Sequence, residues 1–293
     1  MFSRLVLLVR FVLHKQFVLP KQGVRFMSFL SGDAMGRVEG KVAIVTGGAM
    51  GLGEADARAL AREGARVVVT DVNRELGAAV AKDIGGEYRF HDVTNEEQWI
   101  ALIADVVKTH GGLHILVNNA GIVEPGNIET QTYAEYKRQM AVSADGTFLG
   151  CKYAVPAIAK SGGGSIVNMA SIASKRGVHN VSAYCAAKGA VEALTRAVAV
   201  HCLTANNKVR CNSIHPGSID TPMVRGVGAK MVAAGLVSEQ TPTSPPPRPQ
   251  RLGDPSDIAN IVVYLASDES RFMSGQEFIP DGGLSAVMAP FPS

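Results

Sequence analysis

The sequence has few charged residues, few cysteines and no apolar run long enough to cross a bilayer. Charged residues occupy 19% of its 293 positions, and the formal net charge is +3. Its four cysteines, Cys151, Cys185, Cys202 and Cys211, form no C-x-x-C pair, and none stands at metal-ligand spacing from a histidine. We therefore expect reduced, mostly buried thiols in a reducing compartment and no metal site.

The basic residues are unevenly distributed. Five of the 29 basic residues and none of the 26 acidic ones lie in residues 1–32, so the remainder carries 24 basic and 26 acidic residues. A nearly neutral body gives no electrostatic basis for binding nucleic acid. With 46% hydrophobic residues, the body is long enough to bury the core of one domain of about 250 residues.

Residues 1–35 differ in composition from the rest. Their apolar runs are short of the ~20 residues that a spanning helix needs, so we expect no stable membrane insertion. The stretch 1–32, which contains arginines and no acidic residue, has the composition of a mitochondrial presequence. A mis-called start before Met35, an unstructured tail and an interfacial anchor are alternatives. We expect a cytoplasmic protein, or a mitochondrial one if residues 1–34 are a true presequence.

From Lys41 onward, short β-branched runs alternate with helical patterns. The runs predict strands at 41–46, 66–70, 88–91, 113–118, 165–170, 209–214 and 277–279. Helices are expected at 51–63, 74–84, 95–110, about 133–160, 183–203 and 255–266. This alternation predicts an α/β fold, a Rossmann-type doubly wound parallel sheet of about seven strands with helices on both faces, in a single domain over 36–293. The proline-rich segment 241–249 is expected to be an extended loop.

Three glycines separate the first strand from the first helix. Gly47, Gly51 and Gly53 would let the backbone turn tightly and approach a pyrophosphate, and the helix N-terminus would offer free N–H groups. Asp71 ends the second strand, where a carboxylate accepts hydrogen bonds from the adenosine ribose and repels a 2′-phosphate. The sequence therefore predicts NAD as the cofactor, although Arg74 lies near enough to reach a phosphate.

Tyr184 and Lys188 open a long helix four residues apart, which places them on one helical face. A phenol has a pKa near 10, too high for a base at neutral pH. We expect the lysine ammonium and a positively charged nicotinamide together to lower that pKa. Ser171, at the end of the fifth strand, would hold the substrate oxygen within reach of the tyrosine.

With these motifs the sequence resembles the classical-type short-chain dehydrogenase/reductase family over residues 37–285. The residues that carry the resemblance are Thr46-Gly47-x3-Gly51-x-Gly53, Asp92, Asn118-Asn119-Ala120-Gly121, Ser171, Tyr184-x3-Lys188 and Pro216-Gly217. The resemblance implies that Tyr184 exchanges a proton with the substrate oxygen, that Lys188 contacts the nicotinamide ribose, and that Ser171 orients the substrate. Members are commonly homotetramers, so we expect a homotetramer or homodimer built on the helices near 133–160 and 182–203.

The sequence and the resemblance together give one set of cofactor-binding residues. These are Gly47, Met50, Gly51, Leu52, Gly53, Asp71, Val72, Asp92, Val93, Asn119, Ala120, Gly121, Tyr184, Lys188, Pro216, Gly217, Ile219 and Thr221. The resemblance places Thr221 near the nicotinamide carboxamide. One position departs from the family: Ser143 stands where the family usually has an asparagine that helps the proton path from the lysine. Its contribution to catalysis is doubtful for that reason.

A substrate lid is expected near residues 222–253. Its apolar, methionine-containing composition suits a hydrophobic substrate, although packing against its own domain would explain it as well. Bacterial 3β/17β-hydroxysteroid dehydrogenases are similar in the segments Asn168–Ser171, Asn212–Pro216, Leu265–Ser270 and Met273–Gly275, and bacterial cyclic-alcohol dehydrogenases in Met35–Arg37 and Val45–Gly51. We expect reversible NAD-dependent oxidation of a hydroxysteroid or alicyclic alcohol to the ketone. An NADP-type carbonyl or 3-oxoacyl reductase and a weakly active NAD-binding protein remain alternatives.

Overall fold

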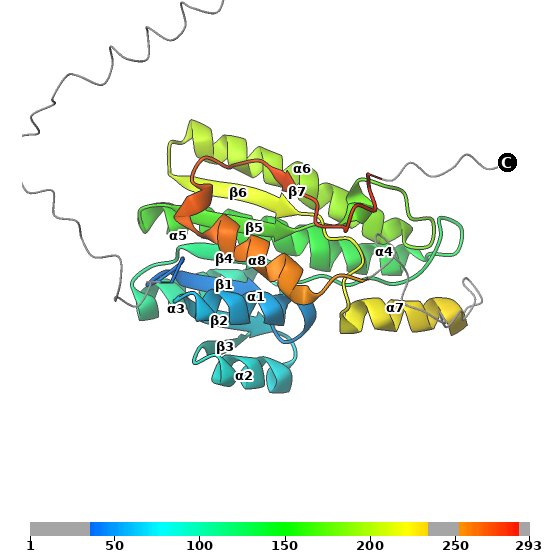
Figure 1. Cartoon of the computed structure of the whole chain (residues 1–293), viewed down its shortest axis with the longest axis horizontal. Coiled ribbons are helices and arrows are strands. Elements are labelled where there is room, and N and C mark those ends of the chain that lie inside the picture. The colour runs from blue at the N-terminus through cyan, green and yellow to red at the C-terminus, as the bar shows by residue number, and fades with distance from the viewer. Residues whose placement is uncertain (1–35, 234–251, 287–293) are drawn as a thin grey trace, which may run out of the picture. The chain divides into compact units, whose positions relative to one another are not determined.

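Seven parallel strands form one sheet in the computed structural model, which describes residues 36–233 and 252–286 (Figure 1). The strands are β1 (Val42–Thr46), β2 (Arg66–Asp71), β3 (Glu87–Phe90), β4 (Ile115–Asn118), β5 (Gly164–Met169), β6 (Val209–Ile214) and β7 (Glu277–Phe278). Their order across the sheet is β3-β2-β1-β4-β5-β6-β7. The predictions for residues 1–35 and 241–249 lie outside the described residues.

Helices cover both faces of the sheet. They are α1 (Gly51–Arg62), α2 (Arg74–Asp83), α3 (Glu96–His110), α4 (Tyr133–Met140), α5 (Gly146–Lys160), α6 (Ser182–Thr204), α7 (Pro222–Ala233) and α8 (Pro255–Ala266). Buried side chains of α1, α2 and α8 pack on one face, and those of α3, α5 and α6 pack on the other. The predicted doubly wound sheet of seven strands is therefore confirmed.

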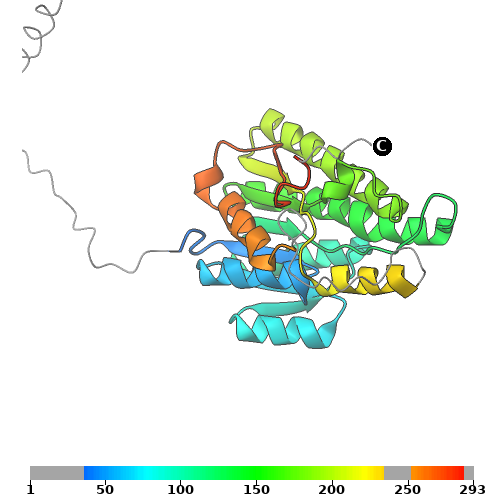
Figure 2. The same cartoon turned by 45° about the vertical axis from the view of Figure 1, so that its right-hand side comes forward.

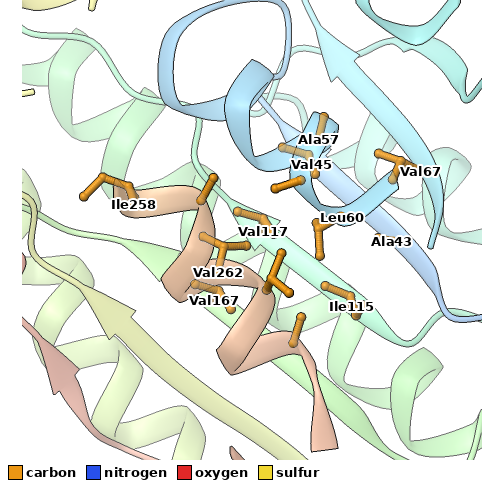
Figure 3. Close-up of a cluster of buried hydrophobic side chains, with 14 of the residues drawn as sticks. Ala43, Val45, Ala57, Leu60, Val67, Ile115, Val117, Val167, Ile258 and Val262 are labelled. Atoms are coloured by element: carbon orange, nitrogen blue, oxygen red, sulfur yellow. The ribbon is translucent and has the colours of Figure 1, made fainter. Parts of the chain in front are cut away.

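The core on the first face lies between α1, α8 and the central strands (Figure 3). Leu60 of α1 and Ile258 and Val262 of α8 are fully buried against β-branched residues such as Val45 and Val117. Strands covered on both faces need apolar residues at every position, which explains why β1 and β4 read as continuous apolar runs. Because neighbouring strands all run parallel, their carboxyl ends lie at the same end of the sheet.

Four of the eight α-helices in the described residues begin at a side-chain cap. Asn73 caps α2 by accepting from the Leu76 N–H at 3.1 Å, and Asn95 caps α3 in the same way. Capping boxes begin α4 and α8. Helix α1 has no such cap, since its N-cap residue Met50 makes no side-chain capping bond in the described part of the chain, and the same holds for α5 and α6.

Two helical features depart from the sequence prediction. The helix expected at about 133–160 is interrupted by a π-helical turn at Ala141–Asp145, between α4 and α5. The segment from Pro222 forms helix α7, which lies beyond the carboxyl ends of the strands (Figure 1, Figure 2). Lid residues 234–251 lie outside the described part.

Helix α1 also buries a carboxyl group. Asp56 has an exposed fraction of 0%, and neither of its oxygens has a hydrogen-bond partner among the described residues. Burial raises the pKa of Asp56 well above its ordinary value of 3.8. The folded chain therefore keeps this carboxyl protonated at pH values where the unfolded chain releases the proton.

Asp56→Asn should stabilise the fold at neutral and alkaline pH. Because the folded state binds the extra proton, the free energy of unfolding of the parent chain falls as pH rises above about 4 and until the folded-state pKa is reached. The slope is up to about 1.4 kcal/mol per pH unit. Denaturant unfolding from pH 4 to 9 should show a gap between the two proteins that widens with pH.

The matched control is Asp83→Asn, which removes an exposed carboxylate paired with Arg58. That change should cost at most about 1 kcal/mol. A gap between parent and Asp56→Asn that stays constant over the whole pH range would contradict the assignment.

Candidate active site

The carboxyl ends of β1, β4, β5 and β6 meet beside the N-terminus of α1 and the start of α7. A pocket of about 130 Å³ opens there. Predicted site residues that line it are Met50, Gly51, Leu52, Asn119, Ser171, Tyr184, Lys188, Pro216, Gly217, Ile219 and Thr221. The structure thus brings the glycine loop and the Tyr-Lys pair to one place, as an open α/β sheet does at its switch point.

Tyr184 and Lys188 lie one turn apart on α6, and the lysine is buried. Lys188 Nζ lies 5.6 Å from the centre of the Tyr184 ring and donates to the Met169 carbonyl at 2.7 Å. Burial lowers the pKa of Lys188 to about 8. The amine is thus mostly protonated at pH 7, but it gives up its proton readily above that.

The phenol of Tyr184 responds to burial in the opposite way. Burial raises its pKa, and a hydrogen bond with the side chain of Ser171 offsets only part of the rise. The protein groups alone therefore do not lower the pKa, whereas the sequence led us to expect a lower value from the lysine and the cofactor together. Burial is therefore the dominant influence on this phenol.

Ser171 follows β5, and its side chain is held by a backbone N–H group of the following turn. Its side chain caps the short 3-10 turn Ile172–Ser174 by accepting from the Ala173 N–H at 3.1 Å. The residue is buried, with 8% exposed, and its side chain also contacts Tyr184. Ser171 and Tyr184 therefore present two hydroxyl groups to the same pocket.

Ser143 lies in the π-helical turn, directly behind the lysine. Its hydroxyl is fully buried and has no hydrogen-bond partner among the described residues. A Cβ atom placed on Gly121 would lie 3.4 Å from Ser143 Oγ and 3.2 Å from Lys188 Nζ. Both polar tips therefore face the same glycine, and π-helical turns of this kind often mark functional positions.

The glycine loop is closely packed against β4. Gly47 and Gly51 have φ angles of +63° and +62°, which favour glycine. A Cβ on Gly53 would lie 2.2 Å from the Gly47 carbonyl oxygen, so no larger residue fits. The Asn119 amide donates to the carbonyls of Thr46 and Gly47 at 3.0 and 3.1 Å, which fixes the loop.

These features fit the phosphates of a dinucleotide. The first N–H groups of a helix need acceptors, and α1 receives none from the side chain of Met50. The same end carries the positive pole of the helix dipole. A helix start without a side-chain cap, beside a loop that requires glycine at Gly47, Gly51 and Gly53, is an arrangement that binds a pyrophosphate.

Asp71 ends β2 beside this loop. One carboxylate oxygen accepts from the Ala49 N–H at 3.1 Å and the other from the Asn73 N–H at 2.8 Å. Asp71 does not cap the following helix, because Asn73 caps α2. The guanidinium of Arg74 lies 3.9 Å above the Phe90 ring.

The remaining predicted cofactor residues lie away from the lining of the pocket. Asp92 accepts from the backbone and hydroxyl of Thr94, and the carbonyl of buried Val93 accepts from the Trp99 indole at 2.9 Å. Val72 is 59% exposed. The backbone of Ala120 donates to the Thr46 hydroxyl at 3.1 Å.

Two features of the site could not be predicted from the sequence. The Met169 carbonyl holds Lys188, and a backbone acceptor is not visible in residue types. A cluster of Glu192, His215 and Glu277 brings three metal-ligand atoms within 4.8 Å of one another. Both carboxylates are already paired with Lys175 and Arg196, which makes this an ion-pair network.

Comparison with known proteins agrees with this geometry. A family model described as enoyl-(acyl carrier protein) reductase matches residues 47–285. The chain is 40% identical over 250 residues to 3-beta-hydroxysteroid dehydrogenase of Comamonas testosteroni, covering 85% of this chain and 97% of that protein. The chain belongs to the short-chain dehydrogenase/reductase family. It is therefore an oxidoreductase that uses a nicotinamide cofactor, and the resemblance found in the sequence is confirmed.

Other short-chain dehydrogenases/reductases show how the relatives vary. The NADP-dependent (R)-specific alcohol dehydrogenase of Lentilactobacillus kefiri is 40% identical, over 85% of this chain and 98% of that protein. Trans-4-hydroxycyclohexanecarboxylate dehydrogenase of Sinomonas cyclohexanicum is 38% identical, over 85% and 95%. A crystal structure of a family member from Burkholderia xenovorans aligns with a TM-score of 0.74 at 36% identity, covering 87% of this chain and 100% of that one.

No helix of residues 36–233 and 252–286 is both long and apolar enough to cross a membrane. All four cysteines lie in this part, and each is a free thiol.

Proposed function

We propose that the chain catalyses the reversible, NAD-dependent oxidation of a hydrophobic cyclic secondary alcohol, a hydroxysteroid or an alicyclic alcohol, to its ketone. The observation that carries the proposal is the grouping of Ser171, Tyr184 and Lys188 in one pocket with the uncapped start of α1. Names of relatives support the substrate class, since they include a hydroxysteroid and a hydroxycyclohexane dehydrogenase.

The proposed proton transfer follows from the positions of the hydroxyls. Ser171 holds the substrate oxygen, and Tyr184, once it has released its own proton, takes the substrate proton as the carbon–oxygen bond gains double-bond character. Bound NAD would accept the hydride from the carbinol carbon and would bring the positive charge of its nicotinamide to the site. That charge would offset the burial that raises the pKa of Tyr184. While its amine is protonated, Lys188 provides a second positive charge near Tyr184, which would stabilise the phenolate.

Ser143 is proposed to serve the path by which Lys188 exchanges protons. Its buried hydroxyl has hydrogen-bond capacity that no described residue uses, and it faces Gly121 as Lys188 Nζ does. A hydroxyl can both donate and accept, which a proton path requires. A weakly active NAD-binding protein remains the alternative, because the side chain is shorter than the family's asparagine.

NAD is proposed over NADP because of Asp71. The backbone bonds from Ala49 and Asn73 hold its carboxylate at the end of β2 beside the glycine loop. A fixed negative charge there would repel a 2′-phosphate. An NADP-dependent relative supports the alternative cofactor, so the choice is open to direct measurement.

The pocket and its lid favour an apolar substrate. Met223 and Val224 at the start of α7 line the pocket together with Ile219. Apolar side chains in this position make favourable contacts with a hydrophobic ring, whereas they offer no hydrogen bonds to the hydroxyl groups of a sugar. The single catalytic domain over 36–293, with its lid near 222–253, remains part of the proposal.

We infer that the chain assembles as a homotetramer or homodimer through α5 and α6. An apolar groove between these helices is lined by residues that include Phe148, Val155, Leu194 and Val198. Phe148 is 51% exposed, which is unfavourable for a large aromatic residue unless a second copy covers it.

The purified chain should reduce NAD when supplied with a 3β-hydroxysteroid or cyclohexanol, followed by absorbance of NADH. Tyr184→Phe should lower kcat about a thousandfold, because the proton has no acceptor, while NADH binding persists. Tyr153→Phe, which removes an exposed hydroxyl bonded to Glu96, is the control and should retain turnover. Full turnover by Tyr184→Phe, or activity confined to acyl thioesters or sugars, would refute the proposal.

Asp71→Asn should weaken the discrimination against NADP. The change keeps the shape and one acceptor oxygen but removes the charge, so the KM for NAD should rise about tenfold and relative use of NADP should increase. Steady-state kinetics with both cofactors measure the ratio of kcat/KM. A parent chain that prefers NADP, or a ratio that Asp71→Asn leaves unchanged, would exclude the assigned role.

Ser143→Ala should reduce kcat about tenfold with NADH affinity unchanged, because the proton path loses its hydroxyl. Ser143→Asn should retain at least the parent rate, since it restores the family's residue. Both variants can be compared by steady-state turnover and NADH fluorescence titration. An unchanged kcat in Ser143→Ala would show that the hydroxyl plays no part.

A further inference from the structure

Helix α6 carries a third polar residue in line with the Tyr-Lys pair. Tyr184, Lys188 and Glu192 are spaced by four residues, which places them along one helical face. Glu192 has a side chain that is 13% exposed, and the proposed reaction does not use it. Its unpaired oxygen lies 4.0 Å from Nδ1 of the fully buried His215.

Glu192 is the centre of an ion-pair network. Its Oε1 accepts from Lys175 Nζ at 2.7 Å and from Arg196 at 3.0 Å. Burial alone would raise the pKa of Glu192, but the hydrogen bonds from Lys175 and Arg196 lower it to about 2. Glu277 of β7 pairs with the same two cations, so four charges join three segments.

The network is attached to the segment that carries Ser171. Ser174 and Lys175 follow Ser171 closely in the chain, and the Ser174 hydroxyl donates to the Ser171 carbonyl at 2.7 Å. His215 Nδ1 lies 2.9 Å from Ser174 Oγ and 3.3 Å from that carbonyl. Because the carbonyl can only accept and Nε2 lies 2.8 Å from the Ser213 hydroxyl, we assign the imidazole proton to Nδ1.

The network therefore connects the two elements that must present their hydroxyls together. Ser171 belongs to the loop after β5, whereas Tyr184 belongs to α6. We propose that Glu192 is a positioning residue, which clamps the Ser171 loop onto α6 through Lys175 and so sets the distance between the Ser171 and Tyr184 hydroxyls. This role rests on the proposed function of those two hydroxyls. A small displacement of reacting groups can cost about a hundredfold in rate.

The test is a double-mutant cycle between Glu192→Gln and Ser171→Ala, with cyclohexanol and NAD or a 3β-hydroxysteroid and NAD. Glu192→Gln should lower kcat about tenfold with little change in the KM for NAD. In the Ser171→Ala background the same change should have no further effect, because the clamp acts through Ser171. Glu269→Gln, which breaks an exposed ion pair with Arg37, is the control and should leave kcat unchanged.

A second measurement does not depend on turnover. The Ser171 side chain lowers the pKa of Tyr184, so ultraviolet titration against Tyr184→Phe reports whether the two hydroxyls meet. Glu192→Gln and Ser171→Ala should each raise the pKa of the phenol, and their combination should raise it no further. If Glu192→Gln fails to fold, Lys175→Met replaces it in both measurements, with the same expected pattern.

The outcomes separate the clamp from the proposed function. Unchanged kcat and phenol titration in Glu192→Gln, or losses that add to those of Ser171→Ala, would overturn the clamp. If Tyr184→Phe retains turnover, the proposed function fails, and the phenol titration alone then decides whether the clamp exists.

Discussion

A buried amine joins helix α6 to the end of strand β5. The bond from Lys188 Nζ to the Met169 carbonyl fixes the helix against the sheet and thereby fixes Tyr184 one turn away. The same burial that holds the pair lowers the pKa of the lysine and raises that of the tyrosine. The protein therefore does not produce a phenolate at neutral pH by itself. In the proposed reaction, proton transfer depends on the positive charge of a bound oxidised cofactor. Tyr184 would therefore act as a base only when the hydride acceptor is bound.

The topology supplies the rest of the geometry. Parallel strands in the order β3-β2-β1-β4-β5-β6-β7 bring the carboxyl ends of β1 and β4 together beside the ends of β5 and β6. The glycine loop, the Asn119 amide and the Ser171 turn all leave the sheet at that end. The start of α1, which has no side-chain cap, lines the pocket on the side suited to phosphates, and Ser171, Tyr184 and Lys188 line it on the side of the reacting hydroxyls.

Residue types predicted the elements that depend on local patterns. The apolar strands, the glycine loop and the Tyr184–Lys188 spacing are all visible in the sequence, because periodicity and glycine placement reflect the backbone directly. The π-helical turn around Ser143 was not predictable, since it depends on how one long helix fits against the sheet. The Met169 carbonyl and the Glu192 network could not be predicted either, because they join residues that the fold alone brings together. The direction of the Tyr184 pKa depends on burial, which spacing does not reveal.

The dependence of the Tyr184 pKa on the charge of the cofactor is tested most directly by titrating Tyr184 with and without cofactor. Difference spectra between the parent chain and Tyr184→Phe should be recorded with no cofactor, with NADH and with NAD. We predict a high phenol pKa in the first two cases and a pKa lower by two or more pH units with NAD, about 3 kcal/mol in favour of the phenolate. A phenol pKa that is the same with NAD as with NADH, or already near neutral without cofactor, would contradict this dependence.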